Sequence, residues 1–239
     1  MKNIAGYFIV LSLMLAVPFA KVSAQATPFE GTITWAITLP QMGDDEAHPM
    51  TINVKGKKVE VEINMGTMGL MKSYTDEEKK KSYMVMEAMK RGFTSDLPSD
   101  SAAYASKDKS DSIDLMPTGQ KATIAGHSAQ EYILKGVKSK GTTVDLSIWA
   151  AADFPKEMQD AFKNGFDSPG QDQKQTKAMK LLATRGLVPV KLVAKTDGET
   201  AMTMEFVKYE QKKLDDALFV PPTDIKYQPM PTGRGGGTN

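Results

Sequence analysis

The residues closest to a catalytic pair are His127 and Ser128, which follow Gly126 near the middle of the 239-residue chain. A histidine that accepts the proton of a serine hydroxyl turns that hydroxyl into a nucleophile. Neighbouring residues of a strand point to opposite faces, however, so these two side chains are poorly placed for such a transfer. The chain also contains no G-x-S-x-G, no H-E-x-x-H, no P-loop and no G-x-G-x-x-G sequence. We therefore expect no catalytic residues and a protein that is not an enzyme.

An acidic stretch is the second group of residues that could do chemistry. Asp44, Asp45, Glu46 and His48 lie within the polar segment 43–49. Three carboxylates are suitable ligands for a hard cation, but consecutive side chains seldom converge on one ion. The spacing of an EF-hand is also absent. We interpret the segment as a solvated loop, and expect neither a metal site nor a cofactor.

Methionine is unusually frequent in the first half of the chain. Eight of the 16 methionines fall between Met42 and Met89, and Met65, Met68 and Met71 follow one another at every third position. Thioether sulfurs can bind cuprous ion. Methionine also fills irregular apolar space and lines adaptable binding surfaces. We favour ordinary core packing first and a pocket lining second, and keep copper binding as a distant alternative.

The first 24 residues are typical of a signal peptide. Lys2 precedes an uncharged apolar run over residues 4–20, and small residues at 22–24 form a cleavage site before Gln25. A retained membrane anchor is the alternative, but the run of about 17 residues is marginal for spanning a bilayer, and the cleavage site follows it directly. No later stretch approaches the length needed to span a bilayer. Without cysteine there is neither a disulfide nor an acceptor for a lipid anchor. We expect a mature chain that is soluble in the periplasm or secreted, with no transmembrane segment.

The charge balance argues against nucleic acid as a partner. Cleavage would remove two of the 30 basic residues and leave 28 against 29 acidic ones. A protein that binds a phosphate backbone needs clustered excess Lys and Arg. Here the lysines at 79–81 directly follow the acidic residues at 76–78, which is typical of a charge-balanced, solvated turn.

Alternating apolar and polar residues predict strands along most of the chain, and these strands must position any site. The stretch 121–150 lies at the centre of this pattern, with two strands that need partners on both sides. Glycine and Asx turns separate the strands. The expected strands cover residues 29–39, 50–55, 58–65, 70–74, 82–86, 123–127, 129–137, 142–150, 187–195 and 199–209.

Two helices are expected between the last strands. Residues 154–162 have apolar side chains at helical spacing, with Asp153 as the expected cap and Pro155 in the first turn. Residues 173–184 form the second. The segment 92–119 is rich in Ser, Asp and Lys, and we interpret it as a mobile excursion that carries a short helix near Ser99.

The expected fold is mostly β. A curved, antiparallel half-barrel sheet of about nine or ten strands would have two or three short helices covering its concave face. We assign residues 25–227 to this single domain, and residues 228–239 to a disordered, glycine-rich tail.

The order of several short motifs resembles the domain-of-unknown-function family 4412. These motifs are the segments 29–31, 50–65, 123–127, 186–190 and 218–222, together with Tyr132 and Trp149. That family is similar in fold to the LolA, LolB and LppX group of periplasmic lipoprotein and lipid carriers. The resemblance implies a half-barrel sheet that wraps apolar surface closed by helices. The chain differs from LolB-type members in one respect, because their lipidated cysteine is missing here.

The function we predict is binding of an apolar or lipid-like ligand in the space between sheet and helices. The predicted lining consists of Ile33, Trp35, Ile37, Val61, Ile63, Tyr132, Leu146, Ile148, Met158, Phe162, Met204 and Phe206. The alternative is a structural or protein-interaction module of the cell envelope with a filled core. Such a module would meet an envelope protein through a strand edge or the segment 92–119.

Overall fold

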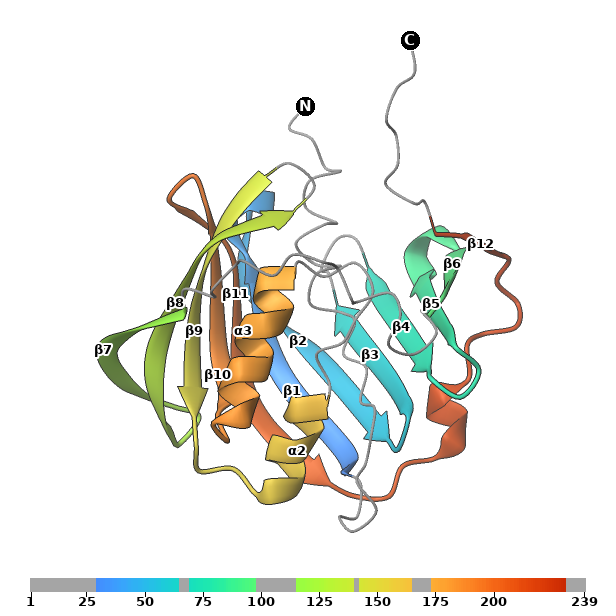
Figure 1. Ribbon diagram of the computed structural model, residues 1–239. Coiled ribbons are helices and arrows are strands. Elements are labelled where there is room, and N and C mark those ends of the chain that lie inside the picture. Colours follow the sequence, from blue (N-terminus) through green and yellow to red (C-terminus); the bar gives the residue numbers. More distant parts are fainter. Residues whose placement is uncertain (1–28, 65–68, 98–114, 140–141, 165–172, 231–239) are drawn as a thin grey trace.

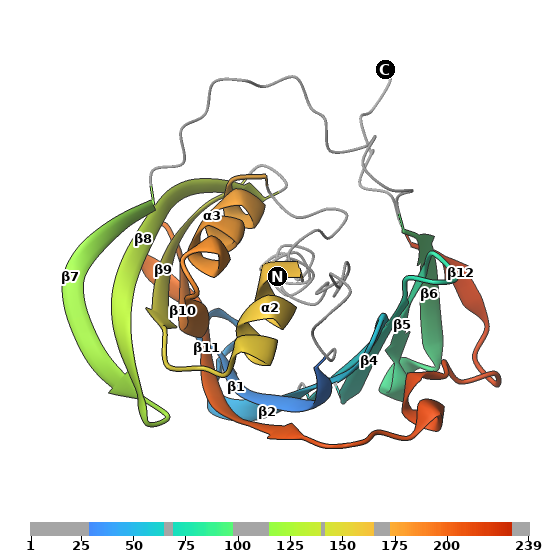
Figure 2. The same cartoon turned by 60° about the horizontal axis from the view of Figure 1, so that its bottom comes forward.

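The described part of the chain forms one open, curved sheet with two α-helices on its concave side (Figures 1 and 2). The computed structural model describes residues 29–64, 69–97, 115–139, 142–164 and 173–230. Within these ranges twelve strands follow the spatial order β12-β6-β5-β4-β3-β2-β1-β11-β10-β9-β8-β7. The prediction of a mostly β half-barrel is confirmed.

Neighbouring strands are antiparallel, except that β12 pairs with β6 in parallel. The strands are β1 (Glu30–Leu39), β2 (Asp44–Lys55), β3 (Lys58–Asn64), β4 (Leu70–Asp76), β5 (Lys81–Met86), β6 (Arg91–Asp96), β7 (Leu115–Ile124), β8 (His127–Ser139), β9 (Thr142–Ala151), β10 (Val188–Thr196), β11 (Glu199–Gln211) and β12 (Tyr227–Pro229). The helices are α2 (Lys156–Asn164) and α3 (Gln173–Thr184), with short 3-10 turns η2 (Pro40–Met42), η4 (Glu87–Met89) and η5 (Asp216–Phe219).

Two tight hairpins form where the sequence predicts them. Ala125 and Gly126 join β7 to β8, and Asp197 and Gly198 join β10 to β11. All four residues have positive φ, from 49° to 86°. A two-residue turn of this kind matches the right-handed twist of the strands that it connects.

Two polar segments that we expected to be irregular are strands instead. Residues 44–49 begin β2, because they find a partner in the end of β1, where His48 pairs with Ile37. The expected excursion, residues 92–119, overlaps most of Arg91–Asp96 and the first half of Leu115–Ile124, which form β6 and β7. Their hydrogen bonds come from β5 and β8, so tertiary pairing outweighs the polar composition. The expected helix near Ser99 lies outside the described residues.

The helices cover one half of the concave face. Helix α2 packs on α3 and β10, and α3 packs on β8 and β10. The apolar residues expected on α2, Met158 and Phe162, are buried. Asp153 does not cap this helix as expected. The carbonyl of Pro155 accepts the N–H groups of Met158 and Gln159, and the helix begins one residue later.

Residues 212–230 form a segment, here called the strap, that crosses the convex face of the sheet (Figures 1 and 2). It leaves β11, places η5 on β3 and β4, and ends as β12 beside β6. β12 extends to Pro229, two residues beyond the expected end of the domain at residue 227. Residues 231–239 lie outside the described part of the chain.

Candidate ligand-binding site

The structure brings all twelve residues of the predicted lining together in one apolar cluster. Each of them is at most 7% exposed. They come from β1, β3, β8, β9, β11 and α2, which span both halves of the half-barrel. Alternation along each strand explains this convergence, because every second side chain of a strand points to the same face.

One row of these side chains runs directly across five strands. Ile37 of β1 is paired with Met204 of β11, and Met204 with Leu192 of β10. Leu192 is paired with Ile148 of β9, and Ile148 with Tyr132 of β8. The row is buried from end to end. Sequence parity predicted four of its members, while Leu192, on a predicted strand, was missing from the predicted lining.

Methionine contributes a large share of the same face. Met50, Met71, Met202 and Met204 are buried in the cluster, and Met158 reaches it from α2. These side chains confirm neither copper binding nor a pocket, but they make the lining flexible and polarisable. Met65 and Met68, which complete the regular methionine spacing, lie outside the described residues.

An aromatic cluster occupies one end of the concave side. Phe206 of β11 lies at its centre, with ring centroids 5.8 Å from Trp35, 5.6 Å from His127 and 5.3 Å from Phe154. His127 also stacks on Phe154 at 4.0 Å. We call these residues, together with Phe29 and Tyr209, the aromatic cluster. Sequence reasoning placed Trp35 and Phe206 in the lining but did not find the cluster, because its members come from β1 and the residue before it, from β8, from β11 and from the loop before α2.

Two polar nitrogens lie within this apolar surrounding. Trp35 Nε1 is buried and has no hydrogen-bond partner in the described residues. His127 Nδ1 lies 3.1 Å from Asp153 Oδ1 without hydrogen-bond geometry, so the contact is an ion pair only when His127 is protonated. Ser128 is exposed, whereas the His127 ring is stacked in the cluster. The pair therefore offers no nucleophile and base.

The acidic residues expected to be solvated do not gather around a metal site. In the described ranges, no three His, Cys, Asp or Glu side chains are close enough together to hold a metal ion. Asp45 and Glu46 are exposed at the start of β2. Successive side chains of a strand diverge, which keeps these carboxylates apart.

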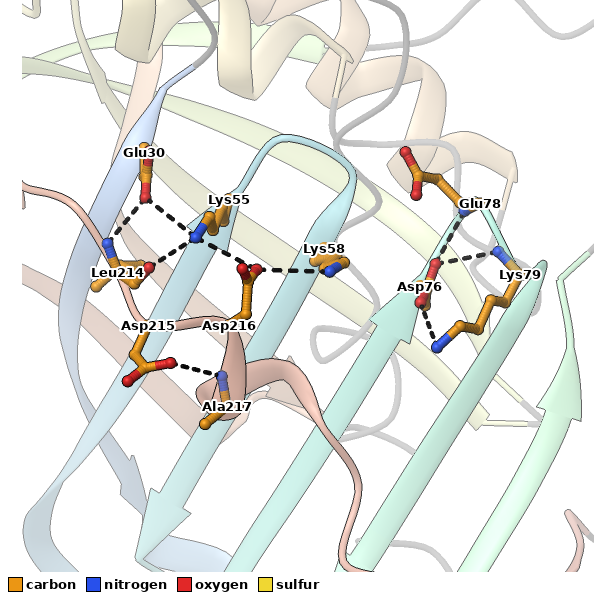
Figure 3. A network of polar contacts seen from close by, with 10 residues as sticks. All are labelled: Glu30, Lys55, Lys58, Asp76, Glu78, Lys79, Leu214, Asp215, Asp216 and Ala217. Atoms are coloured by element: carbon orange, nitrogen blue, oxygen red, sulfur yellow. Dashed lines mark hydrogen bonds and ion pairs between the residues drawn. The ribbon is translucent and has the colours of Figure 1, made fainter.

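The convex side carries polar contacts that hold the strap (Figure 3). Lys55 Nζ donates to the carbonyl of Leu214 at 2.8 Å and lies 3.2 Å from Asp216 Oδ1. Lys58 Nζ lies 3.6 Å from the same oxygen. The Leu214 N–H donates to Glu30 at 2.8 Å. The hydrogen bond and charge of Lys55, with the charge of Lys58, hold the pKa of Asp216 below its ordinary value.

Beside this network, a polar ladder joins three strands. Thr32 donates to Asn53 Oδ1, and Asn53 Nδ2 donates to Glu60 Oε2, each at 2.7 Å. Glu60 is 3% exposed, and burial raises the pKa of its carboxyl group. Burial likewise raises the pKa of Tyr74, which is paired with Glu60, to about 12. Glu60 alternates along β3 with Val59 and Val61 of the apolar cluster, so its carboxyl group lies on the opposite face.

Comparison with known proteins gives a family but no activity. A family model described as Domain of unknown function (DUF4412) matches residues 29–225. A search of the curated proteins found no match. None of the helices in the described part of the chain is both long and apolar enough to cross a membrane.

Solved structures with a similar arrangement are distant. PNGF-II in a C2 crystal form has 12% identity and a TM-score of 0.41, over 84% of this chain and 31% of that one. MucB in complex with MucA(peri) has 9% identity and a TM-score of 0.39, over 83% of this chain and 56% of that one. A LolA superfamily protein from Nitrosomonas europaea has 11% identity and a TM-score of 0.32, over 89% of this chain and 97% of that one. The chain thus spans less than two thirds of PNGF-II and of MucB.

Proposed function

The chain belongs to the DUF4412 family, and we propose that it is an exported, non-enzymatic protein that binds an apolar or lipid-like ligand. The ligand would lie between the concave face of the sheet and helices α2 and α3. One observation carries the proposal: the apolar surface is continuous across both halves of the sheet, whereas the described helices pack chiefly on β8 and β10. The apolar face is therefore wider than the helical cover packed on it.

The chemistry of this face suits hydrocarbon. Its lining is aliphatic, aromatic and methionine-rich, with few polar atoms to orient a ligand. Binding sites for small molecules generally combine such a lining with a small number of placed polar groups. Methionine allows the lining to adjust to the shape of the ligand. The contacts of Figure 3 that hold the strap lie on the opposite face and would stay unchanged when a ligand binds.

Binding of a fluorescent fatty acid to the folded protein tests this function. We expect a Kd of about micromolar order. Ile148, fully buried at the middle of the row across the sheet, is the position to block. Ile148→Trp should weaken binding while the fold persists, and Lys195→Trp, at an exposed position on β10, should leave binding unchanged. If no lipid binds and Ile148→Trp only lowers the melting temperature, the surface is filled core and the proposal is wrong.

A second candidate function is supported by the edge of the sheet. β7 is the terminal strand of the described sheet, and residues 116–121 along it are exposed, with Met116 at 42%. An exposed edge can accept a strand from another protein. If the lipid probe fails, an envelope protein that adds a strand to β7 becomes the favoured partner, and Met116→Pro should abolish that interaction.

Export stays a prediction from the sequence, because residues 1–28 lie outside the described part of the chain. The mass of the protein purified from the cell envelope would test it directly. We expect a chain that begins at Gln25 and fractionates with the soluble proteins. An uncleaved N-terminus in the membrane fraction would contradict this expectation.

A further inference from the structure

The indole N–H of Trp35 is a buried donor that the described residues leave unpaired. Trp35 is 3% exposed, and its ring meets the ring of Phe206 at an interplanar angle of 86°. A donor removed from water without an acceptor loses hydrogen-bond energy that nothing replaces. Buried tryptophan N–H groups usually find a partner. The unpaired atom therefore marks a place where an acceptor would be stabilised.

The position of Trp35 places this donor on the surface where we propose the ligand binds. Its register partners are Met50 on β2 and Phe206 on β11, both buried in the apolar cluster. Along β1 it lies between Ile33 and Ile37, which point to the same face. A ligand that contacts this face would meet hydrocarbon along most of its length and one donor at Trp35.

Other polar groups lie at the same end of the concave side. The rings of Trp35 and His127 both meet Phe206 edge-on, and Asp153 beside His127 is half-exposed. The row through Leu192 and Ile148 contains only apolar side chains up to Tyr132. The concave face therefore has both polar and apolar groups at the aromatic cluster, and only apolar side chains in the row from Ile37 to Ile148. This polarity matches a molecule with one polar end.

We infer that the ligand is an acyl compound whose carbonyl oxygen accepts a hydrogen bond from Trp35 Nε1. This inference rests on the proposed function and adds the class of ligand to it. The hydrocarbon chain would lie along the apolar row, with the acyl oxygen at the aromatic cluster. A site with a buried donor discriminates against molecules that leave the donor unpaired. A fatty acid and an acyl ester would both satisfy Trp35, whereas an alkane would not.

Competition binding tests the inference. Lauric acid, methyl laurate and dodecane would each displace the apolar fluorophore N-phenyl-1-naphthylamine from the full mature chain. Trp35→Phe keeps an aromatic ring but removes the donor. It should lower the affinity for both acyl compounds about fivefold and leave the affinity for dodecane unchanged. Trp149→Phe is the matched control, because Trp149 lies on the opposite face of β9 from Ile148. Each competitor is compared between variants, so its solubility cancels.

The unmodified protein gives a second measurement that does not depend on how a variant folds. The chain has two tryptophans, so 15N-labelled indole groups give two resolvable N–H signals. Lauric acid should move the Trp35 signal downfield, dodecane should not, and the Trp149 signal should stay in place. If both compounds bind and the Trp35 signal is unmoved, the acyl inference is wrong and the proposed function stands. If neither compound binds, the proposed function fails and the inference fails with it.

Discussion

The two faces of strands β1 to β4 differ in burial and in chemistry, because the concave side chains of β1 are buried and the convex ones only partly so. On the concave face, Ile33, Trp35 and Val61 belong to a continuous apolar cluster. On the convex face, Asn53 and Glu60 belong to a hydrogen-bonded ladder, close to where η5 of the strap packs on β3 and β4. The same strands supply both faces through simple alternation.

This difference predicts which face can replace its side-chain contacts with contacts to a ligand. Apolar burial is non-directional, so hydrocarbon from a ligand can replace hydrocarbon from a side chain at little cost. Hydrogen bonds and ion pairs need defined distances and angles, which a moving partner would break. We therefore expect the concave face to accommodate a ligand and the convex face to act as a permanent joint.

The largest effect is expected from a charge placed on the concave side. Met158→Asp puts a carboxylate at a position of α2 that is 1% exposed. Met158 belongs to the apolar cluster, where a buried charge is costly, so the free energy of unfolding should fall by about 3 kcal/mol or more. Denaturant unfolding measures the change. Ala152→Asp, at an exposed position before the helix, is the control and should change stability little. If Met158→Asp leaves the free energy of unfolding unchanged, α2 does not pack in the core.

Truncation of the strap should have the next largest effect. Phe219 is the buried residue of η5, and Phe219→Ala should lower the free energy of unfolding by about 3 kcal/mol. Leu218→Ala changes the neighbouring residue, which is 42% exposed, and should have little effect. At a denaturant concentration where Phe219→Ala remains folded, its affinity for the lipid probe should equal that of the wild type. A weaker affinity of folded Phe219→Ala would show that the strap contributes to the binding site, and that the two faces do not have separate roles.

A smaller, pH-dependent effect is expected at Glu60. Because burial raises the pKa of its carboxyl group, folding favours the protonated form. The stability that this contributes is present below the unfolded pKa, near 4.5, and is lost as the pH rises through the raised pKa. Glu60→Gln should therefore stabilise the protein at pH 7 by about 1 kcal/mol, and the advantage should vanish in acid.

Unfolding of the wild type and Glu60→Gln across that pH range measures the effect. The control is Glu62→Gln, because Glu62 lies on the same face but is more exposed and pairs with Lys72. This control should gain no stability at neutral pH. An equal difference between wild type and Glu60→Gln at all pH values would show that protonation of Glu60 is not the cause.

The smallest effect is expected at the ion pairs of the strap. Asp216 is 68% exposed, so its contacts with Lys55 and Lys58 are screened by salt. Asp216→Asn should change the melting temperature only at low ionic strength. Because the pKa of Asp216 is lowered, its contribution is present at neutral pH and lost in acid. Asp215→Asn is the control, since an amide oxygen can still accept the Ala217 N–H. A large effect of Asp216→Asn in physiological salt would mean that charge, rather than Phe219, fixes the strap.

The sequence by itself determined the local structure and the identity of the inward residues. Alternation from Ile33 to Ile37 defined both a strand and its buried face, and Asp197-Gly198 defined a hairpin turn. The bounds of α3 were predicted to the residue. These features follow from short-range sterics and side-chain period, which the chain carries wherever it lies in space.

Only the tertiary structure decided which distant residues meet. No local pattern in Tyr227–Pro229 indicates that it pairs in parallel with β6, or that the strap crosses the convex face. The aromatic cluster and the unpaired Trp35 N–H arise in the same way, because Trp35 and Phe206 are brought together by the β1–β11 pairing. Such contacts depend on the curvature of the whole sheet and on chain entropy, neither of which a short segment specifies.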